Sequence, residues 1–88
     1  MPLIFDPKKD LQNRLKHGVS LVEAEAFEWE TALLREDRRQ DYGERRYEAV
    51  GYIGLRLFVL VFCMRGDDVR IISLRKANGR EVARYART

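Results

Sequence analysis

The stretch Val69-Arg70-Ile71-Ile72-Ser73-Leu74-Arg75-Lys76-Ala77 decides how the second half of the chain folds. Its alternation predicts a β-strand over Val69–Arg75, in which successive side chains point to opposite faces. One face would carry Val69, Ile71, Ser73 and Arg75, and the other Arg70, Ile72 and Leu74. Guanidinium groups fixed on a sheet present planar donors that suit phosphate or carboxylate recognition. Alternatively, Arg70 and Arg75 are ordinary strand-end cations that pair with nearby acids.

Two further strands precede this one and complete a predicted antiparallel meander. Arg46–Ile53 alternates in polarity, and Gly54 marks the turn after it. Leu57–Met64 is apolar on both faces, so we expect it to be the central strand, covered on both sides. Arg65-Gly66-Asp67-Asp68 supplies the turn into the last strand.

Cap signals predict a first helix over Pro7–His17. Asp6 suits the N-cap, proline suits the first helical position, and Gly18 stands where a C-terminal glycine belongs. Leu11 and Leu15 recur at i, i+4 and give this helix a narrow apolar stripe.

Two capping-box patterns predict two more helices. Ser20-Leu-Val-Glu23 would open a helix that runs to about Glu28. Asn78-Gly-Arg-Glu81 would open the last helix, with three residues facing inward: Val82, Tyr85 and Ala86.

The remaining segments read as short strands and a loop. Leu3–Phe5 and Thr31–Glu36 are brief apolar runs, and Asp37–Glu44 is a polar loop. We therefore expect residues 1–88 to form a single α+β domain. We expect a small antiparallel sheet of three to four strands, two N-terminal helices and one C-terminal helix.

Composition indicates a globular chain with a basic end. Of 88 residues, 45% are hydrophobic, and 17 Lys and Arg exceed 14 Asp and Glu for a net charge of +3. From Arg65 onward, six Arg and one Lys face three acids, a local +4, whereas Glu23–Glu30 holds four Glu and no base. One end of the molecule would attract a polyanion, and another would repel it or meet a basic partner.

The single Cys63 excludes an internal disulfide and a cysteine zinc site, and its apolar surroundings predict a buried thiol. The apolar run near the start is too short for a signal peptide, and a charged residue follows it at once. Leu57–Met64 is too short to span a bilayer. We expect a soluble, cytoplasmic protein without a membrane association.

The residue set limits the chemistry. The chain has one histidine, His17, so neither a transition-metal cluster nor a nucleophilic triad can be built on histidines, and no Gly-rich phosphate loop is present. We expect no metal and no cofactor. Arginine, lysine and one histidine could cleave RNA through its own 2′-OH, with His17 as acid or base. Alternatively, His17 only stabilises the end of a helix dipole.

Several short motifs in series resemble the BrnT family of type II toxins. They are Asn13-Arg-Leu-Lys-His-Gly-Val-Ser20, Glu23-Ala24, Glu44-Arg45-Arg46, Gly51, Asp67–Ile72 and Ser73-Leu-Arg-Lys-Ala77. The resemblance implies a fold like that of RelE-type ribonucleases and an RNase activity that halts translation. It also implies a BrnA-like antitoxin with a ribbon-helix-helix part, through which alone the toxin would meet DNA. The sequence departs from the family at Leu74, where a small residue is common, and at Asn78-Gly79, where the helix start is commonly more basic.

The resemblance also implies site residues. The predicted catalytic residues are His17, Lys16, Arg46, Arg70 and Arg75. The predicted RNA-binding residues are Arg45, Ser73, Lys76 and Arg80. Structural alternatives remain: Arg45 and Arg46 pair with neighbouring acids, and Ser73 satisfies a backbone group.

The predicted function is a metal-independent endoribonuclease toxin that cleaves RNA and inhibits translation. The alternative is a non-catalytic module that binds RNA or an antitoxin through the same basic face, such as a degenerate toxin acting as co-repressor. One histidine and generic carboxylates are a small catalytic set, which favours that alternative.

Overall fold

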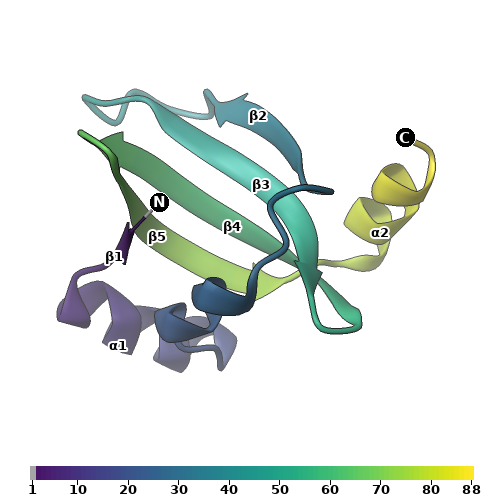
Figure 1. The fold of residues 1–88 in the computed structure, drawn as a ribbon, viewed down its shortest axis with the longest axis horizontal. Coiled ribbons are helices and arrows are strands. Elements are labelled where there is room, and N and C mark those ends of the chain that lie inside the picture. The colour runs from purple at the N-terminus through teal and green to yellow at the C-terminus, as the bar shows by residue number, and fades with distance from the viewer. Residues whose placement is uncertain (1) are drawn as a thin grey trace.

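A computed structural model describes residues 2–88, which form five strands, two α-helices and one 3₁₀-helix (Figure 1). In chain order they are β1 (Leu3–Ile4), α1 (Pro7–His17), the 3₁₀-helix η1 (Leu21–Ala26), β2 (Leu33–Asp37), β3 (Arg46–Ile53), β4 (Arg56–Arg65), β5 (Asp68–Lys76) and α2 (Gly79–Ala86).

Within residues 2–88 the strands make one mixed sheet in the order β1-β5-β4-β3-β2. Strands β2 to β5 are antiparallel, whereas β1 runs parallel to β5 and places Leu3 beside Val69 and Ile4 beside Arg70. The prediction of a three- to four-stranded antiparallel sheet was wrong. Leu3–Phe5 was read as a short strand but not as part of the sheet, because its partner β5 lies at the far end of the sequence.

The prediction of a central, doubly covered β4 is confirmed. This strand lies between β3 and β5, and its consecutive residues from Leu57 to Cys63 are all buried. Cys63 is 1% exposed, as predicted for a buried thiol, and burial raises its pKa. A strand in this place buries both faces, which explains why it lacks alternation.

Helix α1 has the predicted bounds and caps. Asp6 accepts a hydrogen bond from the Lys8 N–H, and Gly18 takes the left-handed conformation (φ 71°) after the last turn. The apolar stripe does not face the sheet, however, because Leu11 is 52% and Leu15 80% exposed. Within α1 the buried residue is Asn13.

The prediction of a second N-terminal α-helix was wrong, because η1 is a 3₁₀-helix that ends at Ala26. The capping box of Ser20 and Glu23 is present. Phe27 then becomes extended (φ −68°, ψ 131°) and enters the core, and the Glu28 N–H donates to the Tyr52 carbonyl at 2.9 Å. Burial of Phe27 and pairing with the end of β3 therefore stop the helix.

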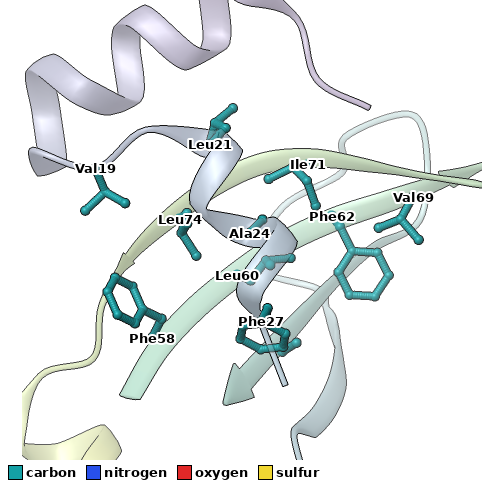
Figure 2. Close-up of a cluster of buried hydrophobic side chains, with 11 residues drawn as sticks. Val19, Leu21, Ala24, Phe27, Phe58, Leu60, Phe62, Val69, Ile71 and Leu74 are labelled. Carbon is teal, nitrogen blue, oxygen red and sulfur yellow. The ribbon is translucent and has the colours of Figure 1, made fainter. Parts of the chain in front are cut away.

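The main core lies between η1 and one face of the sheet, which we call the core face (Figure 2). Leu21, Ala24 and Phe27 come down from η1 and the residue after it. They meet buried sheet residues of β3, β4 and β5: Ala49, Phe58, Leu60, Phe62, Val69, Ile71 and Leu74.

A register shift in β5 changes which of its residues belong to that core. Phe62 pairs with Ile71, but Val61 pairs with Ser73, so β5 carries Ile72 as an extra residue. Val69, Ile71 and Leu74 therefore share the core face. The predicted alternation, which put Ser73 and Arg75 with Val69 and Ile71, was wrong beyond the bulge.

Helix α2 rests on the edge of the opposite face of the sheet. Its Asn78–Glu81 capping box forms as predicted, but within Gly79–Ala86 no residue is buried, and Val82 is 46% exposed. The prediction that Val82 and Ala86 face inward was wrong. Tyr85 makes the contact instead: its ring lies 5.5 Å from that of Tyr52, and its hydroxyl donates to the Thr31 carbonyl at 2.8 Å.

Gly51 allows Phe27 to approach β3, and its replacement should destabilise the fold. A Cβ there would lie 2.7 Å from Phe27 Cζ, 3.1 Å from Ala32 Cβ and 3.2 Å from the Glu28 carbonyl oxygen. We expect Gly51→Ala to lower the free energy of unfolding by about 1–3 kcal/mol in urea denaturation. Gly79→Ala is the control, because no described atom lies within 4 Å of a Cβ there. Equal stability of Gly51→Ala and wild type would contradict this packing.

Candidate functional site

A polar pocket of about 300 Å³ lies where the C-terminal half of α1 meets the face of the sheet opposite the core face. Parts of α1, β3, β4, β5 and the segment after β2 line it. Its charged and hydroxyl side chains are Lys9, Lys16, His17, Arg39, Glu48, Ser73 and Arg75. Val59 and Val61 of β4 form part of its apolar lining.

Helix α1 brings Lys16 and His17 to the pocket. They occupy the last turn, next to the negative end of the helix dipole, and Gly18 ends the helix directly after them. Partial burial lowers the pKa of His17 below its ordinary value of 6.5, and the positive charges of Lys16 and Arg75 lower it further. His17 is therefore mainly a neutral imidazole at pH 7.

Strand β5 brings Ser73 and Arg75, which the bulge turns away from the core. Arg75 is held by Glu81 of α2 in a two-pronged ion pair, with Nη1–Oε1 and Nη2–Oε2 both at 2.8 Å. This ion pair holds the pKa of Glu81 down at about 2 and raises that of Arg75. The guanidinium is thus fixed on the sheet by a second element.

Strand β3 contributes a buried carboxylate, Glu48. It is 5% exposed and lies opposite Val61, which in turn lies opposite Ser73. Arg35 of β2 holds Glu48 Oε1 with Nη2 at 2.7 Å and Nε at 3.0 Å. A carboxylate accepts at both of its oxygens, so Glu48 can accept from a ligand as well as from Arg35.

The segment after β2 contributes Arg39. Asp37 accepts from Arg39 Nε and Nη2, both at 2.8 Å, and from the Tyr42 hydroxyl at 3.3 Å. These bonds lower the pKa of Asp37 to about 2, with the Arg39 hydrogen bonds as the main cause. Arg35, Arg39 and Arg75 are therefore all oriented by carboxylates.

Four of the predicted site residues meet at this pocket: Lys16, His17, Ser73 and Arg75. The other five do not line it. Arg45, Lys76 and Arg80 are exposed, and Arg70 is half-buried opposite Cys63. Arg46 sits 4.1 Å from the centre of the Tyr42 ring, and its Nε lies 3.5 Å from Glu44 Oε2, the kind of local pairing foreseen as its structural alternative.

Sequence reasoning did not single out Glu48, Arg39, Arg35 or Glu81 as parts of a site. One signal was available for Glu48, because a carboxylate in the middle of a strand that faces an apolar neighbour is costly unless it is paired. The arginine partners could not be assigned, since four acids and three bases lie between Arg35 and Arg46.

Residues 2–88 contain no group of three or more His, Cys, Asp or Glu side chains placed to hold a metal ion. None of the helices in that range has both the length and the apolar character needed to cross a membrane.

Comparison with protein families gives a match over most of the chain. Residues 5–81 fit the family described as the ribonuclease toxin BrnT of type II toxin–antitoxin systems. This chain belongs to the BrnT family. No individual curated protein gives a significant match. The range that fits the BrnT family contains every residue of the polar pocket, together with Glu81. The resemblance noted in the sequence is thus confirmed, and with it membership in a family of ribonuclease toxins that pair with an antitoxin.

The Arg75–Glu81 pair should show itself in the pH dependence of stability of this BrnT-family chain. The pKa of Glu81 is about 2 in the folded chain against an ordinary 4.5, so its stabilising effect is complete above about pH 5 and is lost as the pH falls toward 2. We expect Glu81→Gln, which can keep the capping box, to be less stable than wild type by about 1 kcal/mol at pH 7.

That difference in the free energy of unfolding should shrink between pH 5 and pH 2, as measured by urea denaturation. Glu25→Gln, on the exposed side of η1, is the matched control and should track the wild type. A pH-independent difference between Glu81→Gln and wild type would rule out the ion pair as its source.

Proposed function

We propose that this chain is a metal-independent endoribonuclease toxin that cleaves RNA at the polar pocket and thereby inhibits translation in the cytoplasm. One observation carries the proposal: a single pocket joins Lys16 and His17 of α1 to Ser73 and Arg75 of β5. Family membership makes RNA the substrate class. The pocket supplies what cleavage through the 2′-OH needs, namely a proton acceptor near neutrality and cations for the phosphate.

His17 is the general base in this mechanism. Its lowered pKa leaves the imidazole neutral at pH 7, so it can accept the proton of the 2′-OH as that oxygen attacks the adjacent phosphorus. The new bond from the 2′-oxygen to phosphorus forms while the bond to the 5′-oxygen breaks. Lys16, beside His17, donates a proton to the leaving oxygen. The products are a 2′,3′-cyclic phosphate and a 5′-hydroxyl end.

Arg75 stabilises the charge that develops on the phosphate. Among described residues, Glu81 and the Lys76 carbonyl take three of its five N–H groups. Nε–H and one Nη2–H remain, and these two form a fork that fits two phosphate oxygens. Glu81 therefore orients the Arg75 guanidinium and leaves these two donors for a phosphate. Arg39 and the Ser73 hydroxyl add donors on either side.

Glu48 supports the pocket as a hydrogen-bond acceptor, because Arg35 fixes the position of its carboxylate. Its negative charge also balances the local cations when RNA is absent.

The partner in this proposal is a BrnA-like antitoxin with a ribbon-helix-helix part. Family membership implies an antitoxin. The proposal extends this to a protein that neutralises the toxin and carries the contact with DNA.

Cleavage of RNA in EDTA tests the proposed activity directly. We expect wild-type protein to produce 2′,3′-cyclic or 3′-phosphate ends in EDTA, and to arrest growth when induced in cells without the antitoxin. His17→Ala and Arg75→Ala should each lose roughly 100-fold or more in kcat/KM, since general acid–base and charge-stabilising groups typically contribute this much. Arg56→Ala, which removes an exposed arginine at the start of β4, is the charge-matched control and should keep full activity. Bound but intact RNA would favour the non-catalytic binding module.

The pH profile tests the role of His17. As general base it acts when deprotonated, so kcat/KM should rise with pH through an apparent pKa below 6.5 and then level off. The rising limb should be absent from the residual activity of His17→Ala. A rate that falls as the pH passes through 6 to 7 would instead make His17 the proton donor.

A further inference from the structure

The outer edge of β5 is only partly covered by another strand. β1 pairs with Val69 and Arg70 and then ends. Beyond it the side-chain amide of Asn13 takes the place of a partner strand. Its Nδ2 donates to the Leu74 carbonyl at 2.7 Å, and its Oδ1 accepts from the Leu74 N–H at 3.1 Å. The amide thus pairs with one residue of β5 as a backbone peptide group would.

The same amide also fixes the turn after α1. Nδ2 donates a second hydrogen bond to the Val19 carbonyl at 2.9 Å, just past Gly18. Asn13 is 4% exposed, so these three bonds replace water that cannot reach the group. One side chain therefore ties α1, the turn after it and β5 together.

These hydrogen bonds of Asn13 lie between the pocket residues of α1 and the pocket residues of β5. Lys16 and His17 follow Asn13 by three and four residues, on the same side of α1. Ser73 and Arg75 flank Leu74, the residue that the amide holds. A shift of α1 along β5 would therefore separate the imidazole from the guanidinium.

We propose that Asn13 is a positioning residue, whose amide sets the placement of His17 and Lys16 relative to Ser73 and Arg75. The role rests on the proposed ribonuclease function, but the placement itself can be measured without RNA. The hydrogen bonds need both a donor and an acceptor, and this requirement selects asparagine. Aspartate would turn a carboxylate toward the carbonyl oxygens of Val19 and Leu74.

Titration of His17 by NMR is the first test, because His17 is the single histidine of the chain. Burial, Lys16 of α1 and Arg75 of β5 lower its pKa, and Lys9, Arg39 and Glu48 also line the pocket. In Asn13→Ala the last turn of α1 loses its anchor, so the pKa of His17 should move up toward 6.5. Asn13→Ala adds no charge, so a change in the pKa would report a change in the position or the burial of the imidazole.

Two controls separate positioning from stability. Gly51→Ala weakens the core on the other face of the sheet, so its His17 pKa should equal that of wild type despite its lower stability. Leu15→Ala changes an exposed residue of α1, close to Asn13 in sequence, and should leave both the pKa of His17 and the stability unchanged. Asn13→Ser, whose short side chain cannot reach the N–H and the carbonyl of Leu74 together, should shift the pKa in the same direction as Asn13→Ala and serves if the alanine variant does not fold.

Kinetics give the second readout. We expect folded Asn13→Ala to lose about 10- to 100-fold in kcat, with a much smaller change in KM, because misplacing a catalytic group by about 1 Å has effects of that order. An unchanged His17 pKa and an unchanged kcat in the folded variants would overturn the positioning role. Absence of cleavage by wild type would overturn the proposed function alone, and the titration would still decide the role of Asn13.

Discussion

One extra residue in β5, Ile72, allows this strand to place apolar side chains on the core face of the sheet and polar ones in the pocket on the opposite face. Before Ile72 the odd-numbered residues of β5 point into the core, and after it the even-numbered Leu74 does. Without the bulge, Arg75 would point into the apolar core, where an arginine without a partner is strongly unfavourable. Leu74 would point into the pocket. The bulge thus lets one strand close the core and carry Ser73 and Arg75 on the other side.

The parts of the fold that could be predicted are those with local signals. Asp6-Pro7 and Gly18 mark both ends of α1, and the apolar run of β4 marks the central strand, so both were predicted correctly. The strand at Leu3–Phe5 was anticipated, but its parallel pairing with β5 was not, because that pairing depends on a distant partner. The bulge was missed although the sequence marks it, since the apolar pair Ile71-Ile72 shifts the alternation by one residue. The start of the second helix was predicted from its capping box, but its type and end were not, because it is a 3₁₀-helix that stops where Phe27 turns into the core.

The candidate site could be predicted only in part, and mainly by resemblance. Composition indicated phosphate chemistry, and family motifs indicated Lys16, His17, Ser73 and Arg75, which do meet in one pocket. The carboxylates that orient the arginines could not be predicted, because ion pairing depends on which strands become neighbours. Those pairs hold the cations in place before any ligand arrives, and such fixed donors stabilise developing charge without rearranging.

The pocket combines residues from α1, early in the chain, with residues from β5, late in the chain. The amide of Asn13 meets Leu74 across 61 positions of sequence. A ribosome makes α1 early, but nothing can complete the pocket until β5 has also been made. Closing so long a loop also slows folding relative to local contacts. A nascent chain therefore spends most of its synthesis without an assembled pocket.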